Sequence, residues 1–170
     1  MDEQRRRFEQ LVLPHLGAAY NLARWLAAQE AEDVAQEAML RAFRAFDGFR
    51  GGDAKAWLLA IVRNCHYTAV GRTRKTVPLP EQGENDIASD APDPERSAID
   101  ADRARKLNQA IASLPDEFRE ALVLREMEDM SYRDIAEITG APIGTVMSRL
   151  ARARALLRER WSAETKETAP

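Results

Sequence analysis

The residue types that could bind nucleic acid gather on a predicted helix near the C-terminal end of the chain, at residues 142–161. At about 100° per residue, its apolar positions share one arc: Val146, Leu150, Ala153 and Leu157. The face turned away from this arc carries two hydroxyl and two guanidinium groups, on Thr145, Ser148, Arg149 and Arg152. Arginine can pair bidentately with guanine, and hydroxyls can reach phosphates or base edges. The pattern indicates a surface that reads duplex DNA.

The residues that precede this helix strengthen that interpretation, because an arginine face alone is usually only solvated. Ser131 can cap a predicted helix at 131–139, with Asp134 three residues later as a weaker form of the capping box. Gly140, Ala141 and Pro142 then form a tight turn. A short helix, a Gly-containing turn and a second helix are typical of a helix-turn-helix.

A second concentration of basic groups lies at residues 54–76, which contain five basic residues and no acidic one. Aromatic and amide side chains are interleaved with them. Such a mixture suits single-stranded nucleic acid, whose unstacked bases can rest on aromatic rings and arginine planes. The candidates are Lys55, Trp57, Arg63, Asn64, Tyr67 and Arg72. Trp57 alone is equally well explained as a core residue.

Catalysis and metal binding are disfavoured. Cys65 is the single cysteine, so an intramolecular disulfide and a Cys-only zinc site are excluded. His66 lies beside it, but His15 is the only other histidine, and no nucleophile–base–orienter set can be assembled. We expect no enzyme activity, no metal and no cofactor.

The elements that must position these residues are predicted to be helical throughout. In 32–46 an apolar stripe recurs at spacings of three and four: Ala35, Ala38, Met39, Ala42, Phe43 and Phe46. Residues 8–28 are helical in composition with a bend at Pro14, and 54–75 resume the pattern. A further helix ends near Ser113 with Leu107, Ala110, Ile111 and Leu114 on its stripe, and Pro115 opens another over 116–128. We predict an all-α fold.

Charge divides the 170 residues into parts that the net charge of −3 conceals. Residues 77–102 hold one basic and eight acidic residues together with four of the eight prolines. This composition is typical of a flexible linker. It would join a small helical domain at 1–76 to a second at 103–161, followed by a frayed tail at 162–170. We find no signal peptide and no membrane span, and expect a soluble, cytoplasmic protein.

The order of several motifs resembles the bacterial sigma factors. EDVAQEA (32–38), FRGG (49–52), AWL (56–58) and IVRN (61–64) are similar to sigma region 2. LP (114–115), FRE (118–120), SYRDIA (131–136), GTVMSRL (144–150) and RAR (152–154) are similar to region 4. With these two regions in this order, the chain resembles an extracytoplasmic-function (ECF) sigma factor, which binds core RNA polymerase, directs it to promoters and promotes strand opening.

The resemblance implies a role for each candidate surface. The clamp-helix coiled coil of core RNA polymerase would bind Asp33, Gln36, Glu37 and Arg41. The minus-ten element of promoter DNA would be melted and held by the 54–76 set. The minus-thirty-five element would be read by Thr145, Ser148, Arg149 and Arg152, while region 4 also contacts the β flap. The acidic linker would thread toward the polymerase interior.

The resemblance also implies an anti-sigma factor as a partner. Met147 departs from the family pattern, because many members carry Lys or Arg at this position, so the promoter sequence cannot be transferred by analogy.

Two other classes of function compete with the sigma factor. A free-standing helix-turn-helix regulator would have no need of the basic, aromatic 54–76 segment. A sigma-like decoy that sequesters an anti-sigma factor would have no reason to keep Arg149 and Arg152. Both alternatives are therefore weaker.

Overall fold

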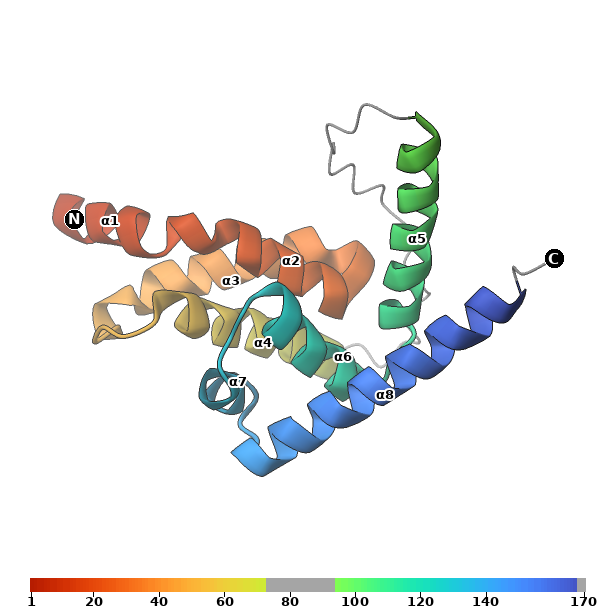
Figure 1. Ribbon diagram of the computed structural model, residues 1–170. Helices are drawn as coiled ribbons and strands as arrows, with labels where there is room; N and C mark the ends of the chain where they lie inside the picture. Colours follow the sequence, from red (N-terminus) through yellow and green to blue (C-terminus); the bar gives the residue numbers. More distant parts are fainter. Residues whose placement is uncertain (73–93, 168–170) are drawn as a thin grey trace.

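The structure is a computed structural model that describes residues 1–72 and 94–167. Within these two ranges every regular element is helical, which confirms the predicted fold class (Figure 1). Most of the predicted linker, residues 77–93, lies outside the described residues.

The first half of the chain folds into four α-helices separated by short tight turns. The elements are α1 (Asp2–Leu11), η1 (Leu13–His15), α2 (Leu16–Ala27), η2 (Ala28–Glu30), α3 (Ala31–Ala45), η3 (Phe46–Gly48) and α4 (Ala54–Arg72). Pro14 interrupts the helix at the predicted bend, because it has no N–H for the helical ladder. Gly51 and Gly52 adopt φ of 93° and 94°, which a side chain would strain. They deliver the chain to Asp53, whose Oδ1 accepts from the N–H groups of Lys55 and Ala56 and so caps α4.

The second half contains α5 (Pro94–Ala112), α6 (Asp116–Leu122), the π-helical turn η4 (Val123–Met127), α7 (Tyr132–Thr139) and α8 (Ile143–Glu167). Two helices extend beyond the predicted domain boundaries. Residues 94–102 belong to α5 rather than to the linker, because Pro94 fits the first turn of a helix. Residues 162–167 continue α8 rather than forming a frayed tail.

The helix-turn-helix has the predicted caps. The Asp134 N–H donates to Ser131 Oγ at 3.0 Å, which starts α7. Gly140 ends α7 in the left-handed region at φ 70°, and its N–H donates to the Ala136 carbonyl at 2.9 Å. The turn then leads directly into α8.

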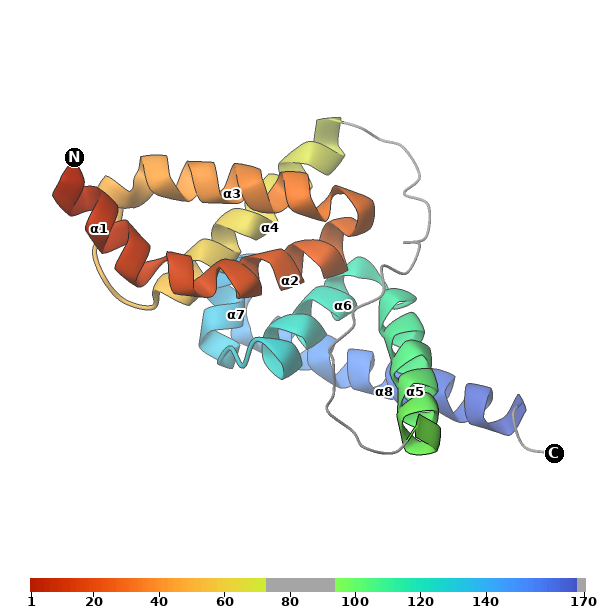
Figure 2. The same cartoon turned by 90° about the horizontal axis from the view of Figure 1, so that it is seen from above.

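The two predicted domains share one hydrophobic core. Leu22, Leu58 and Val62 of the first half belong to the same buried cluster as Leu124 and Ile135 of the second half. Figure 2 shows α6 and α7 against α2 and α4, and Trp25 of α2 also packs against the smaller cluster around Leu122 and Ala153. The two domains are therefore packed against one another in a closed arrangement.

Two residues of the predicted apolar stripes lie nearer the surface than expected. Ala35, Ala38, Ala42 and Phe46 are buried, but Phe43 is 41% exposed at the edge of α3, where its ring meets Phe8 edge-on. On α5, Ala110 and Ile111 are buried, as is Leu114 just after its end, whereas Leu107 is 40% exposed. α5 packs mainly on α8, which covers only the C-terminal turns of α5 (Figure 1).

Candidate nucleic-acid interface

The apolar arc of α8 points inward, as the helical wheel predicted. Val146 and Leu150 are each 1% exposed and Ala153 is fully buried, while Leu157 is only half-buried. On the other side, Ser148 and Arg152 are exposed. Met147 is 52% exposed, about 100° around the helix from Ser148. The exposed part of this face therefore offers one hydroxyl and one guanidinium.

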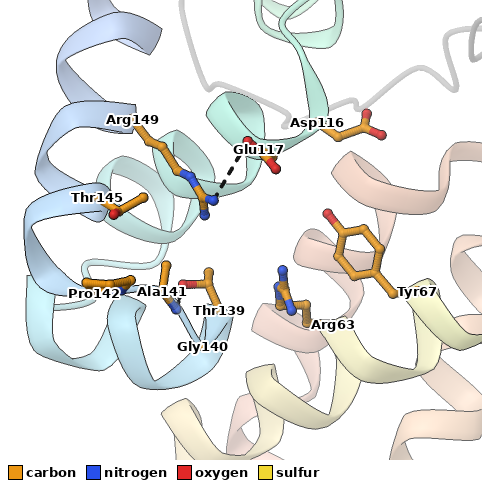
Figure 3. Close-up of a pocket in the computed structure, with 10 residues that line it drawn as sticks. All are labelled: Arg63, Tyr67, Asp116, Glu117, Thr139, Gly140, Ala141, Pro142, Thr145 and Arg149. Carbon is orange, nitrogen blue, oxygen red and sulfur yellow. Dashed lines mark hydrogen bonds and ion pairs between the residues drawn. The ribbon is translucent and has the colours of Figure 1, made fainter.

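Thr145 and Arg149 lie instead at a pocket between the helix-turn-helix and α4 (Figure 3). Arg149 is 22% exposed, and its Nη2 lies 3.7 Å from Glu117 Oε2 of α6. The pocket has a volume of about 570 Å³. Arg63 and Tyr67 of α4 line its other side. Side chains predicted to contact two different promoter elements thus meet at one cavity.

Arg63 and Tyr67 bind a carboxylate of the second half. Arg63 Nε donates to Glu120 Oε1, and the Tyr67 hydroxyl donates to Glu120 Oε2 at 3.5 Å. The Arg63 guanidinium also stacks over the Tyr67 ring, 4.5 Å from its centre. Burial raises the pKa of the Glu120 carboxyl although Arg63 opposes this, and burial together with Glu120 raises the pKa of Tyr67 to about 12.

Lys55, at the start of α4, makes a similar contact with Glu128. Its Nζ lies 3.2 Å from Glu128 Oε2 and donates to the Glu128 backbone carbonyl at 2.8 Å. Asn21 Nδ2 of α2 donates to the other carboxylate oxygen at 2.8 Å. The Glu128 side chain is only 9% exposed. Both halves of the chain therefore supply polar partners at this point.

Trp57 and Asn64 lie on a different side of α4. Seven residues separate them, which places them about 20° apart on the helix, whereas Arg63 lies about 100° from Asn64. Asn64 is exposed, and Trp57 is half-buried against the rings of Phe46 and Phe49, at 6.3 and 5.0 Å between centres. The side chain of Arg72 lies outside the described residues. The predicted single-strand set is thus divided between a free face and a covered face.

The predicted polymerase-binding residues share the outer face of α3. Asp33 and Gln36 are exposed, and Arg41 Nε donates to Glu37 Oε1 at 2.8 Å. Leu40, seven residues after Asp33, lies on the same face and is 52% exposed. The exposure of Leu40 could have been predicted from the sequence, because this residue lies outside the apolar stripe and is surrounded by charged residues.

Sequence reasoning missed Glu120 and Glu128 altogether. Each looks like an ordinary surface carboxylate of a charged helix, and nothing local distinguishes it from the exposed Glu117 or Glu126. Their burial depends on contacts with residues more than 50 positions away. In the described ranges, no helix is both long and apolar enough to cross a membrane.

Comparison with known families agrees with the motifs. Residues 11–76 match sigma-70 region 2, and residues 104–157 match sigma-70 region 4. Both parts of the closed structure thus belong to one class of protein, the sigma factors of RNA polymerase.

Curated relatives narrow the class. The RNA polymerase sigma-H factor of Pseudomonas aeruginosa is 43% identical over 136 residues, which cover 75% of this chain and 70% of that protein. The ECF sigma-E factor of Haemophilus influenzae is 37% identical over 145 residues, covering 80% and 77%. The ECF sigma factor SigE of Mycolicibacterium smegmatis is 36% identical over 167 residues, covering 95% and 64%. The chain belongs to the ECF sigma factors, non-enzymatic subunits of RNA polymerase that direct transcription initiation.

Two solved structures resemble the whole described fold. The sigma factor RpoE of Bartonella quintana, crystallised with the anti-sigma factor NepR, has a TM-score of 0.75 at 28% identity and covers 92% of this chain and 98% of that one. CnrH, in complex with the cytosolic domain of CnrY, has a TM-score of 0.63 at 25% identity, covering 97% and 91%.

Proposed function

We propose that α4 opens the promoter at the minus-ten element and that its Trp57–Asn64 face holds the displaced strand first. The observation that carries this proposal is the free face of a helix with basic and aromatic residues and no acidic residue between 54 and 72. An exposed amide beside a partly exposed indole suits an unstacked base. Lys55, Arg63 and Tyr67 would join once the second half of the chain moves away.

The minus-thirty-five element would be bound as duplex by α8. Ser148 and Arg152 are already exposed, and Arg149 and Thr145 lie at the edge of the pocket. The caps of α7 and the tight turn after it position these side chains at the N-terminal half of a second helix, which is the part that enters the major groove in helix-turn-helix proteins.

Core RNA polymerase would bind the outer face of α3 through Asp33, Gln36, Glu37 and Arg41. The protein would act in the cytoplasm, where this polymerase works. The clamp helices of the polymerase would contact these residues around Leu40, and region 4 would contact the β flap. The exposed leucine among charged groups supports this surface, because interface anchors are commonly apolar side chains ringed by polar ones.

An anti-sigma factor is a further proposed partner. The solved relatives RpoE and CnrH were each captured with a regulatory protein or domain. Their likeness to this chain extends over 92% and 97% of its length, which includes both regions.

Strand opening is tested by run-off transcription with core polymerase on two templates, a closed promoter and one already melted at the minus-ten element. We expect Trp57→Ala and Asn64→Ala to slow initiation on the closed promoter by about tenfold and much less on the melted one. Stacking is worth roughly 1–3 kcal/mol per base, which is enough for this effect.

The exposed Ser97 of α5 lies outside the proposed DNA and polymerase surfaces and gives the control Ser97→Ala, which should leave both templates unaffected. Equal defects of Trp57→Ala on the two templates would assign this residue to the core instead of to strand opening.

A further inference from the structure

The closed arrangement places carboxylates of region 4 on basic groups of region 2. Glu120 is only 1% exposed, and the side chains closest to its charge are Arg63 and Tyr67. Glu128 receives Lys55 and Asn21. The basic partners are themselves mostly covered, with Arg63 21% and Lys55 25% exposed. Two region 4 carboxylates therefore occupy the positions around Arg63 and Lys55 that an anionic phosphate would need.

The closed arrangement is also incompatible with simultaneous use of both promoter surfaces. Arg63 and Arg149 line one cavity (Figure 3). The minus-ten and minus-thirty-five elements are about 25 base pairs apart, or about 85 Å along a B-form duplex at 3.4 Å per base pair. The two regions must separate before they can contact both elements.

We propose that Glu120 and Glu128 form a carboxylate clamp that holds the free sigma factor closed and competes with nucleic acid for Arg63 and Lys55. This inference rests on the proposed role of α4 in binding the promoter strand. Core polymerase, which must hold the two regions apart, binds the open form, so the clamp lowers the apparent affinity for core in proportion to the fraction of chains that are open.

The clamp is suited to opening because the burial of Glu120 opposes its attraction to Arg63. Burying Glu120 removes it from water, and this cost offsets much of its attraction to Arg63. The raised pKa of the Glu120 carboxyl reflects the same opposition between burial and charge. When the regions separate, all four charged groups regain water, so a partner of moderate affinity can shift the equilibrium.

The first test compares the full chain with a Glu120→Gln/Glu128→Gln double variant, which preserves side-chain size and removes both charges. Small-angle X-ray scattering of the free protein reports its radius of gyration, and titration with core polymerase reports the apparent dissociation constant. We expect a larger radius and about tenfold tighter core binding, equivalent to about 1.4 kcal/mol. Glu126→Gln is the matched control, because Glu126 pairs with Arg154 inside region 4 at 2.7 Å, and it should change neither quantity.

A charge swap provides the second test. Glu128→Lys places two ammonium groups together and should expand the free chain, whereas Lys55→Glu added to it restores an opposite pair and should compact the chain again. Circular dichroism confirms that helicity is retained in every variant. A double Gln variant with unchanged radius and core affinity, or a swap that stays expanded, overturns the clamp.

These readouts involve no DNA and therefore separate the clamp from the proposed function. If the clamp holds but Lys55→Ala and Arg63→Ala initiate normally on the closed promoter, then α4 does not hold the strand through these residues. If both variants are defective while the radius of gyration is unchanged in the carboxylate variants, the promoter role of α4 is supported and the clamp is refuted.

Discussion

At the scale of single residues, Arg149 and Arg152 illustrate how neighbouring arginines can have different surroundings. Arg152 projects into solvent, whereas Arg149 is mostly covered and lies near Glu117. A side chain that already has a defined orientation loses less freedom on binding and is better suited to reading a base. We therefore assign Arg149 to base recognition and Arg152 mainly to phosphate.

The two arginines are separated by measuring promoter affinity against salt and sequence. Arg149→Ala should cost about 1–3 kcal/mol and relax preference at one position of the minus-thirty-five element. Arg152→Ala should weaken all sequences alike and lower the salt slope by roughly one unit. Val146→Ala is the control: it should destabilise the fold by about 1–3 kcal/mol, because Val146 is buried. A stable Val146→Ala with an unfolded Arg149→Ala would mean that the DNA face is wrongly placed.

At the scale of one element, the outer face of α3 should act as a unit. Asp33→Ala, Glu37→Ala and Leu40→Ala should each weaken binding of core polymerase by about 1–2 kcal/mol without loss of helicity, because none of the three is part of the buried core. Binding is measured by titration with core and folding by circular dichroism. Glu32→Ala, on the same helix but about 100° from Asp33, should bind normally. A parallel loss of helicity and affinity would assign this face to folding.

The elements themselves were largely predictable, because they are bounded by residues with a local effect. Pro14, Pro115 and Gly140 mark interruptions that require nothing beyond the backbone rules for proline and glycine. The helical conformation of residues 94–102 was not predicted, because Pro94 fits equally an acidic, proline-rich linker and the first turn of a helix. The acidic composition of 95–101 agrees with the exposure of all their side chains. It gave no sign that these residues are helical.

The candidate site was predictable only where a residue's role depends on its own helix. The apolar arc through Val146 and Leu150 needed no tertiary information. The contact that covers Arg63 with Glu120 does need tertiary information, because it joins residues 57 positions apart and no sequence periodicity indicates it. For the same reason the sequence did not show that the two domains pack together, with Leu58 and Leu124 in one core.

At the scale of the whole molecule, the buried ionisable groups should make stability depend on pH in two opposing ways. Burial lowers the pKa of His66, so the stability it contributes is complete above its unfolded value, about 6.5, and is lost as pH falls below it. Burial raises the pKa of Glu120, so its contribution is complete at low pH and is lost as pH rises through the raised value.

Urea unfolding at a series of pH values from 7.5 to about 5 separates the two groups, since each proton contributes a slope of at most about 1.4 kcal/mol per pH unit. His66→Gln should flatten the loss of stability on acidification below about pH 6.5. Glu120→Gln should steepen it, because the opposing term is removed. His15→Gln, at the other histidine, is the control for a general effect of removing an imidazole. Identical slopes in all four proteins would show that neither buried group is linked to folding.

The shared core also has a consequence for the order of events on the ribosome. The region 2 helices are complete at residue 72, whereas α8 residues that close the structure extend to Leu150. At about 5–20 residues per second, about 4–16 s pass between the synthesis of these two points. Until residues 120–128 have been made and have packed, the apolar side of α2 and α4 lacks its cover, and Lys55 and Arg63 have no carboxylate opposite them. Each newly made molecule therefore passes through an open stage before region 4 can pack on region 2. Its first encounters with other cell components occur before the closed arrangement forms.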